Sequence, residues 1–245
     1  MKIKLPDVTL AMVDRVDPDW SARTLNYCCR KIEFASVELW SFEKPRVAFR
    51  GKFHRIPKFT YKEHFQWMSD TWPQYISAKF VLNVHKDGFI LNPHLWNKEF
   101  LQYDYIGAPW PVFWGHVFRV GNGGFSLRSR RFLQATMANG HLVKDAPEDL
   151  FYCVTMRPEF EARGIRYAPV ELAATFSQEH PIEEVPFDDT KVFGFHAWTH
   201  DSRKKLCHDI RDGVFDEKPG LLKRLGRLFG KALPPKASTH RVCEQ

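Results

Sequence analysis

The sequence has 245 residues, of which 44% are apolar and 15% aromatic, a composition typical of a folded globular protein. A chain of this length can form one large domain with an extension. The net charge of +7 comes from residues 218–241, where seven Lys and Arg occur without an acidic residue. The rest of the chain is balanced in charge, so no nucleic acid is expected as a partner of the main domain.

The N-terminal residues contain only a short apolar run, which Asp7 and Asp14 interrupt. This run is too short and too polar for a signal peptide or a membrane span, so we expect a cytoplasmic protein. The five cysteines include no C-x-x-C pair, which fits reduced thiols in that compartment.

Strand and helix patterns alternate in the first third of the chain. Strands are expected at residues 7–13, 35–41 and 78–85, and helices at residues 21–32 and over part of 61–76. The third strand is a continuous apolar run, as in strands that are buried on both faces of a parallel sheet. This order predicts an α/β fold with a central, mostly parallel sheet flanked by helices.

A histidine and an aspartate stand at the end of the third strand. His85 and Asp87 are one strand period apart, so both can project to the same side. Ligands of open α/β sheets bind beyond the carboxyl ends of the strands, and a His-x-Asp pair there can hold a divalent ion beside a diphosphate. An ordinary hairpin turn, with residues 89–93 as the returning strand, explains the same sequence.

Trp110 lies in an aromatic stretch between Pro109 and Pro111, which place it on a loop. Its flat apolar ring suits a sugar or a nucleobase in an acceptor pocket. Aromatic side chains more often pack in the core, and this alternative stays open for Trp110.

A glycine-rich segment follows at residues 121–124. Its glycines allow close backbone approach, and residues 126–131 are expected to open a helix whose free N–H groups and arginines favour an anion. The spacing is neither a dinucleotide-binding fingerprint nor a P-loop. A phosphate or sugar site is therefore only one reading of this segment.

Glu148 and Asp149 follow Pro147 at an expected helix start. Carboxylates in a first helical turn stabilise the helix through its dipole. One of them can instead act as a general base that takes a proton from an attacking hydroxyl. The two side chains point in different directions on a helix, so only one is expected to reach a reacting centre.

Five blocks in a fixed order carry a family resemblance: DGFILNPHLWNKEFLQYDYIGAPWP, VGNGGFSLRSRRFL, PEDLFYC, GIRYAPVELAATFSQE and VFGFHAW. Together they resemble a family of bacterial and eukaryotic domains, formerly of unknown function, that is related to GT-A glycosyltransferases. The resemblance covers residues 8–200. It implies a single GT-A-like, Rossmann-like domain that uses a nucleoside-diphosphate sugar as donor.

The resemblance also implies a metal site. GT-A enzymes commonly hold Mn²⁺ or Mg²⁺ with an Asp-x-Asp motif after a central strand and with a late histidine. Asp87 matches the second aspartate of the motif, and His196 matches the late histidine. His85 replaces the first aspartate, and this departure puts the dependence on a metal in question.

The resemblance further implies an inverting transfer to a hydroxyl of a glycan or lipid-linked acceptor, with Asp149 as the base and Glu148 beside it. Residues similar to donor- and acceptor-binding positions are Val13, Asp14, Trp110, Asn122, Gly123, Gly124, Phe125 and Ser126. Two other classes of function remain: a metal-dependent hydrolase of a phosphate or sugar-phosphate ester, and a non-catalytic module that binds glycans or nucleotides.

The predicted domains are residues 1–202, the GT-A-like domain, and residues 203–245, a basic extension. Within the extension, residues 218–233 place leucines on one helical face and basic residues on the other. This pattern predicts an amphipathic helix on an anionic membrane surface, with the protein peripheral on its inner face. The alternative is a helix that docks by its leucines on the protein's own core.

Overall fold

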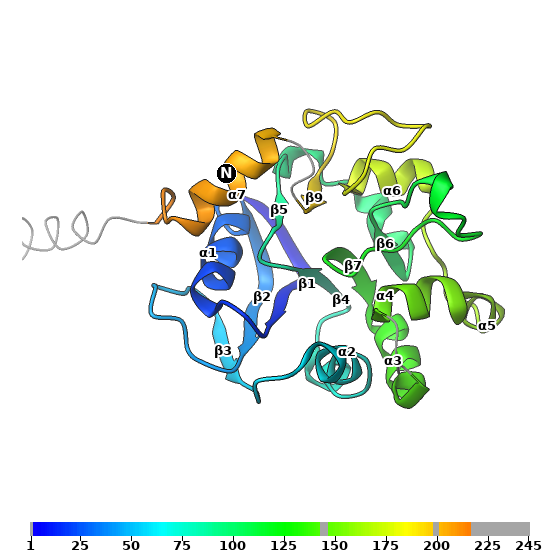
Figure 1. Cartoon of the computed structure of the whole chain (residues 1–245), viewed down its shortest axis with the longest axis horizontal. Helices are drawn as coiled ribbons and strands as arrows, with labels where there is room; N and C mark the ends of the chain where they lie inside the picture. Colours follow the sequence, from blue (N-terminus) through cyan, green and yellow to red (C-terminus); the bar gives the residue numbers. More distant parts are fainter. Residues whose placement is uncertain (1, 143–146, 198–200, 217–245) are drawn as a thin grey trace, which may run out of the picture. The chain divides into compact units, whose positions relative to one another are not determined.

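A computed structural model describes residues 2–142, 147–197 and 201–216 (Figure 1). The described residues up to Phe215 form one unit. The predicted amphipathic helix at residues 218–233 lies outside the described residues. Within them, no helix combines the length and the apolar character that crossing a bilayer requires.

A six-stranded sheet forms the centre of this unit. In spatial order its strands are β3 (Lys52–Arg55), β2 (Ile32–Ser41), β1 (Ile3–Asp14), β4 (Phe80–Val84), β7 (Phe125–Ser129) and β6 (Tyr105–Gly107). The first four run parallel to one another, and β7 runs antiparallel to both of its neighbours. The predicted α/β fold with a mostly parallel central sheet is therefore confirmed.

The direction in which the chain winds changes at β1. The chain first adds β2 and β3 on one side of β1 and then returns to place β4 on the other side. The C-terminal parts of both strands are buried, from Val8 to Asp14 in β1 and from Val81 to Val84 in β4. In open α/β sheets, ligands bind at the carboxyl ends of strands at such a switch point.

A smaller sheet contains β5 (Gly88–Ile90), β9 (Gly194–His196) and β8 (Ser177–Gln178), in that order. A tight turn leads from β4 into β5, closed by a hydrogen bond from Gly88 N–H to the carbonyl of His85 at 3.0 Å. However, β5 pairs antiparallel with β9 and not with β4. The hairpin alternative for residues 89–93 is therefore wrong, because this turn connects two different sheets.

The helices flank the sheets, and α1 and α7 lie side by side (Figure 1). The α-helices are α1 (Pro18–Cys28), α2 (Tyr61–Asp70), α3 (Arg130–Asn139), α4 (Glu148–Leu150), α5 (Arg157–Ala162), α6 (Val170–Phe176) and α7 (Asp201–Arg211). A π-helical stretch, Phe151–Thr155, follows α4. The short 3₁₀ turns are Trp72–Tyr75, Pro93–Leu95, Lys98–Gln102, Val112–Trp114 and Gly140–Leu142.

Local capping explains where the longer helices begin. Asp17 caps α1 by accepting a hydrogen bond from Trp20 N–H at 3.0 Å. Thr60 and Glu63 cap α2 reciprocally, each side chain binding the backbone N–H of the other residue. The helices were expected at residues 21–32 and over part of 61–76, and these caps place their starts at Pro18 and Tyr61.

The helix expected to open at residues 126–131 begins later than predicted. Residues Phe125–Ser129 form β7, which is buried along its whole length between β4 and β6. The helix α3 begins only at Arg130, where Ser129 Oγ accepts a hydrogen bond from Phe132 N–H at 3.0 Å. The glycine segment thus precedes a strand and is separated from the start of α3 by β7.

The helix α7 crosses residue 202, where the predicted domain division lies. Its Arg203 is 1% exposed and connects the helix to the smaller sheet. Arg203 donates to Asp189 Oδ1 at 2.8 Å and to the carbonyl of Gln178 at 3.2 Å. Two rings, Phe187 and Phe195, lie against its guanidinium group.

Candidate active site

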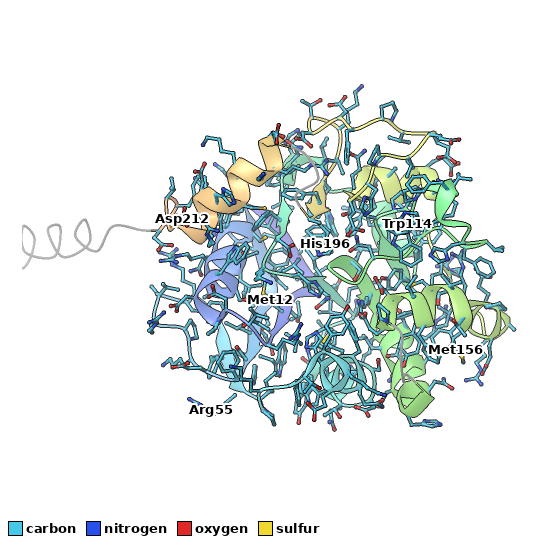
Figure 2. All side chains as sticks on the ribbon, viewed as in Figure 1. Met12, Arg55, Trp114, Met156, His196 and Asp212 are labelled. Atoms are coloured by element: carbon cyan, nitrogen blue, oxygen red, sulfur yellow. The ribbon has the colours of Figure 1, made fainter. Side chains whose placement is uncertain are left out.

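A cleft of about 440 Å³ opens at the carboxyl ends of β1 and β4. Figure 2 shows Met12, His196 and Trp114, all in the cleft wall, in that order from left to right. The predicted site residues that line the cleft are Val13, Asp14, His85, Trp110, Asn122, Gly123, Gly124, Glu148, Asp149 and His196. One pocket thus collects candidates from widely separated parts of the chain.

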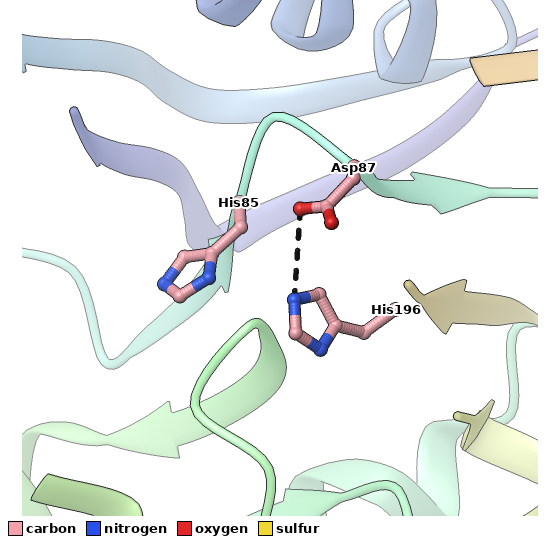
Figure 3. Close-up of side chains that lie close together, drawn as sticks. All are labelled: His85, Asp87 and His196. Atoms are coloured by element: carbon pink, nitrogen blue, oxygen red, sulfur yellow. Dashed lines mark ion pairs between the residues drawn. The ribbon is translucent and has the colours of Figure 1, made fainter. Parts of the chain in front are cut away.

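Three candidate metal ligands lie together (Figure 3). Two of them, His85 and His196, line the cleft, whereas Asp87 lies beside His196 and is not part of the lining. His85 follows β4, Asp87 lies in the turn before β5, and His196 ends β9. Each offers one ligand atom, and these atoms lie within 4.8 Å of one another. His196 Nε2 is 3.6 Å from Asp87 Oδ1, and the ring centroids of the two histidines are 5.2 Å apart.

Glu179, directly after β8, fixes the His196 ring and was not predicted. Its Oε1 lies 3.1 Å from His196 Nδ1, and its Oε2 accepts a hydrogen bond from Asn122 Nδ2 at 2.6 Å. A carboxylate that holds the second nitrogen of a ligand histidine is common around protein metal ions. The only signal for it in the sequence was its place in the block that ends at residue 179.

Burial and neighbouring charges shift the pKa values of His85, Asp87 and His196 away from their usual values. Burial, and then the nearby His196, hold the pKa of His85 well below its usual value, so this ring is neutral. Burial also disfavours a charge on His196, but Asp87 and Glu179 outweigh it and raise the pKa of His196 to about 10. Burial works against ionisation of Asp87 too, yet the hydrogen bond with His196 holds its pKa well below the usual range.

The loop before β7 packs directly on these ligands. Asn122 has a φ of 72°, and its Oδ1 accepts hydrogen bonds from the backbone N–H groups of Gly124 and Phe125 at 2.9 and 3.1 Å. A Cβ atom at Gly124 would overlap the His196 ring. The glycine at this position therefore provides space for the imidazole.

Two residues beside the candidate metal ligands have strained backbone conformations. Among the described residues, Asn122 and Ala197 are the non-glycine positions with positive φ, at 72° and 62°. Ala197 follows His196 directly, and its N–H donates to the carbonyl of Asp87 at 3.2 Å. Strained residues of this kind cluster at functional sites, where the surrounding structure holds them.

The two neighbouring carboxylates have different surroundings. Glu148 is 5% exposed and forms an ion pair with the buried Arg128, with 2.7 Å between Oε1 and the guanidinium nitrogen. Asp149 Oδ2 accepts a hydrogen bond from Gly123 N–H at 2.8 Å. Burial and then the charge of Glu148 raise the pKa of Asp149 to about 6. The expectation of a helix start is confirmed, and the two side chains do have separate partners.

At the end of β1, the carboxylate of Asp14 accepts hydrogen bonds from neighbouring protein groups. It accepts hydrogen bonds from the N–H groups of Val16 and Asp17 at 3.1 and 3.2 Å and from Ser41 Oγ at 3.2 Å. Beside it, the guanidinium group of Arg15 lies 5.1 Å from the centre of the Tyr61 ring. Arg15 and Tyr61 line the cleft and were not predicted.

Trp110 combines the two roles that the sequence left open. It is 3% exposed and packs against Gly121, where a Cβ atom would overlap its ring, and it also forms part of the cleft wall. Phe125 and Ser126, in contrast, do not line the cleft. Both are fully buried on β7, because the strand occupies the position expected for an exposed helix start.

Comparisons with known proteins agree with this architecture. Residues 52–196 match a family described as "Protein of unknown function (DUF5672)". No curated protein matches the sequence. A glycosyltransferase involved in the glycosylation of the major capsid of PBCV-1 is similar in structure, with a TM-score of 0.50 and 12% identity over 82% of this chain and 98% of that chain.

The apo-form glycosyltransferase GlyE of Streptococcus pneumoniae TIGR4 is also similar, with a TM-score of 0.50 and 11% identity. The likeness covers 97% of this chain and 66% of that chain. At such low identities it shows the fold alone. The chain therefore has the GT-A-like fold of glycosyltransferases, as predicted.

Proposed function

The chain belongs to the DUF5672 family, and we propose that it is a glycosyltransferase that moves a sugar from a nucleoside-diphosphate sugar to a hydroxyl of a glycan or lipid-linked acceptor. One observation carries this proposal. The candidate metal ligands His85 and His196 and a carboxylate of raised pKa, Asp149, line one cleft at the switch point of the sheet, and Asp87 lies beside His196.

The three side chains fit a divalent ion. Two imidazoles and one carboxylate offer two nitrogens and an oxygen, a set that favours Mn²⁺ over Mg²⁺, which prefers oxygen ligands and keeps its waters. Glu179 holds the second nitrogen of His196, so Nε2 faces Asp87. When bound here, such an ion would neutralise charge on the departing nucleoside diphosphate.

Asp149 is the proposed base, and Glu148 its fixed neighbour. An ionised Asp149 can take the proton of an acceptor hydroxyl, which then attacks the anomeric carbon from the face opposite the diphosphate and inverts it. A pKa of about 6 leaves Asp149 ionised at neutral pH and yet basic enough for this transfer. Glu148 is tied to Arg128, and its charge helps to keep that pKa high.

We assign the binding of the nucleotide, the transferred sugar and the acceptor to different parts of the cleft wall. We assign the end near Val13, Asp14 and Arg15 to the nucleotide, because Tyr61 and Arg15 offer a ring and a cation there. Trp110 and the backbone of Asn122 to Gly124 are assigned to the transferred sugar and the acceptor. The anionic membrane contact of residues 218–233 remains part of the proposal.

A thermal-shift screen tests the proposal. The full chain is heated with UDP, GDP and their hexose conjugates, each with and without Mn²⁺. A bound nucleotide at about 100 times its Kd should stabilise the protein by about 2.7 kcal/mol. We expect this stabilisation for one nucleotide class, and only when Mn²⁺ is present.

Turnover of the nucleotide sugar so found separates the three functional classes. A transferase releases the nucleoside diphosphate faster when an acceptor is added, whereas a hydrolase releases it at the same rate without one. A binding module gives stabilisation without any turnover. Absence of stabilisation by every nucleotide would contradict the proposal.

A further inference from the structure

An apolar loop, defined here as residues 112–117, stands at the mouth of the cleft. Four large apolar side chains in it are exposed: Val112 by 46%, Phe113 by 81%, Trp114 by 40% and Val117 by 86%. The sequence from Pro111 to Phe118, PVFWGHVF, contains no Lys, Arg, Asp or Glu. Contiguous exposed apolar side chains of this kind mark an interaction surface.

The loop has a fixed backbone at its base. Pro109 pairs with Val120 across its two ends, and Trp110 N–H donates to the carbonyl of Arg119 at 2.6 Å. In return, Arg119 Nε donates to the carbonyl of Trp110 at 2.9 Å. Above this base, the 3₁₀ turn Val112–Trp114 ends at Gly115, whose φ is 74°. The side chains are thus presented by an ordered turn.

The charged side chains beside the loop do not favour an anionic partner. Arg119, the cation at its base, is engaged with Glu184, with 3.0 Å between NH2 and Oε2. The hydrogen bond that Arg119 donates to Glu184 raises the pKa of Arg119, and the nearby Glu183 and Glu171 raise it further. Arg157, whose guanidinium group lies 4.6 Å from the centre of the Phe118 ring, is likewise paired with a carboxylate, that of Glu161. The tip itself is neutral.

We propose that the apolar loop inserts into the interface of a zwitterionic lipid bilayer. Phe113 and Val117 would enter the acyl boundary, where exposed apolar area is removed from water. Trp114, with an apolar body and a polar N–H, suits the level of the headgroups. The tip of the loop is uncharged, so insertion of the loop into zwitterionic lipid is expected to be insensitive to salt.

The loop also belongs to the cleft. Trp114 and His116 lie in the cleft wall, and the Trp114 ring is 4.8 Å from the ring of His180. Insertion of the loop would therefore bring the mouth of the cleft to the bilayer surface. If the proposed transfer reaction holds, on which this step alone rests, the acceptor is a lipid-linked molecule and not a free glycan.

Flotation with phosphatidylcholine vesicles tests the insertion, using the full chain without donor or acceptor. The variant Phe113→Ser/Val117→Ser is compared with Tyr75→Ser/Met137→Ser, which removes two side chains of 53% and 41% exposure elsewhere. We expect the loop variant to lose vesicle binding by at least about tenfold, the control to bind as the unchanged chain does, and high salt to have no effect.

Two further arms make the result decisive. Phe113→Trp should retain binding, because an interfacial aromatic residue is restored. A chain ending at residue 216 should also still bind, because the loop and not residues 218–233 is responsible. Equal binding of the loop variant and the unchanged chain would overturn the proposal. Binding to anionic vesicles alone, or loop-dependent dimers in gel filtration without vesicle binding, would overturn it too.

Discussion

Nδ1 of His196 lies 3.1 Å from Oε1 of Glu179, while the other oxygen of the same carboxylate binds Asn122. One side chain thus orients both the candidate metal histidine and the loop before β7. Glu179→Gln should weaken Mn²⁺ binding about 10- to 100-fold, the usual effect of removing such a partner. Calorimetric titration with Mn²⁺ measures this, and Glu184→Gln, which removes an ion-paired glutamate on the surface, is the matched control.

Asp87 supplies the carboxylate of the candidate metal group. Asp87→Asn should abolish Mn²⁺-dependent nucleotide binding and leave the fold intact, because its side chain is partly exposed at a turn. Nucleotide affinity with and without Mn²⁺ is the measurement. Asp188→Asn, at an exposed ion pair with Lys191, should change neither value. A Mn²⁺-dependent affinity that survives in Asp87→Asn would remove Asp87 from the site.

Asp149 accepts a hydrogen bond from Gly123 N–H and lines the cleft. Asp149→Asn should lower turnover about 10²-fold or more while donor affinity stays nearly constant, since a general base acts in the chemical step. Single-turnover kinetics with a bound donor separates the two quantities. An active Asp149→Asn together with an inactive but folded Glu148→Gln would assign the base to Glu148.

The pH profile of turnover follows from the same carboxylate. Burial and the charge of Glu148 raise the pKa of Asp149 to about 6, and only the ionised form accepts a proton. Turnover should therefore fall as the pH drops through about 6 and level off above it. A profile that stays flat from about pH 5 to 7 would show that no group with this pKa controls the reaction.

The ion pair between Glu148 and Arg128 should matter for stability. The two side chains are 7% and 3% exposed, and removal of one partner leaves an uncompensated buried charge. Glu148→Gln should lower the free energy of unfolding by about 3–5 kcal/mol, measured by urea denaturation. Glu159→Gln breaks the exposed pair with Arg163 and should change it by less than about 1 kcal/mol.

The parts of the site that depend on local pattern could be predicted from the sequence. The apolar run of β4 located His85 and Asp87 at a strand end, and Pro147 located the helix start that carries Asp149. His196 was found through the family resemblance, which places a late histidine on the metal. For His85, Asp87 and Asp149, the signal lies within a few residues of the side chain that it identifies.

The parts that depend on pairing between distant strands could not be predicted. A helix was expected to open at Ser126, but residues 126–129 pair with β4 and β6 and therefore belong to β7. Glu179 reaches His196 only because β8 and β9 pair in parallel. No periodicity near residue 179 encodes that register, because it is set by contacts across the smaller sheet.

The contacts of Arg203 have a consequence for how the protein is made. Arg203 in α7 binds the carbonyl of Gln178, the residue before Glu179, and α7 also lies against α1. During synthesis the N-terminal strands leave the ribosome first, whereas His196 and then α7 emerge only after all six strands of the large sheet. A nascent chain that stalls before residue 196 can complete the large sheet and yet has no His196 to face Asp87. Such a product of interrupted translation is expected to fold in part and to be chemically silent.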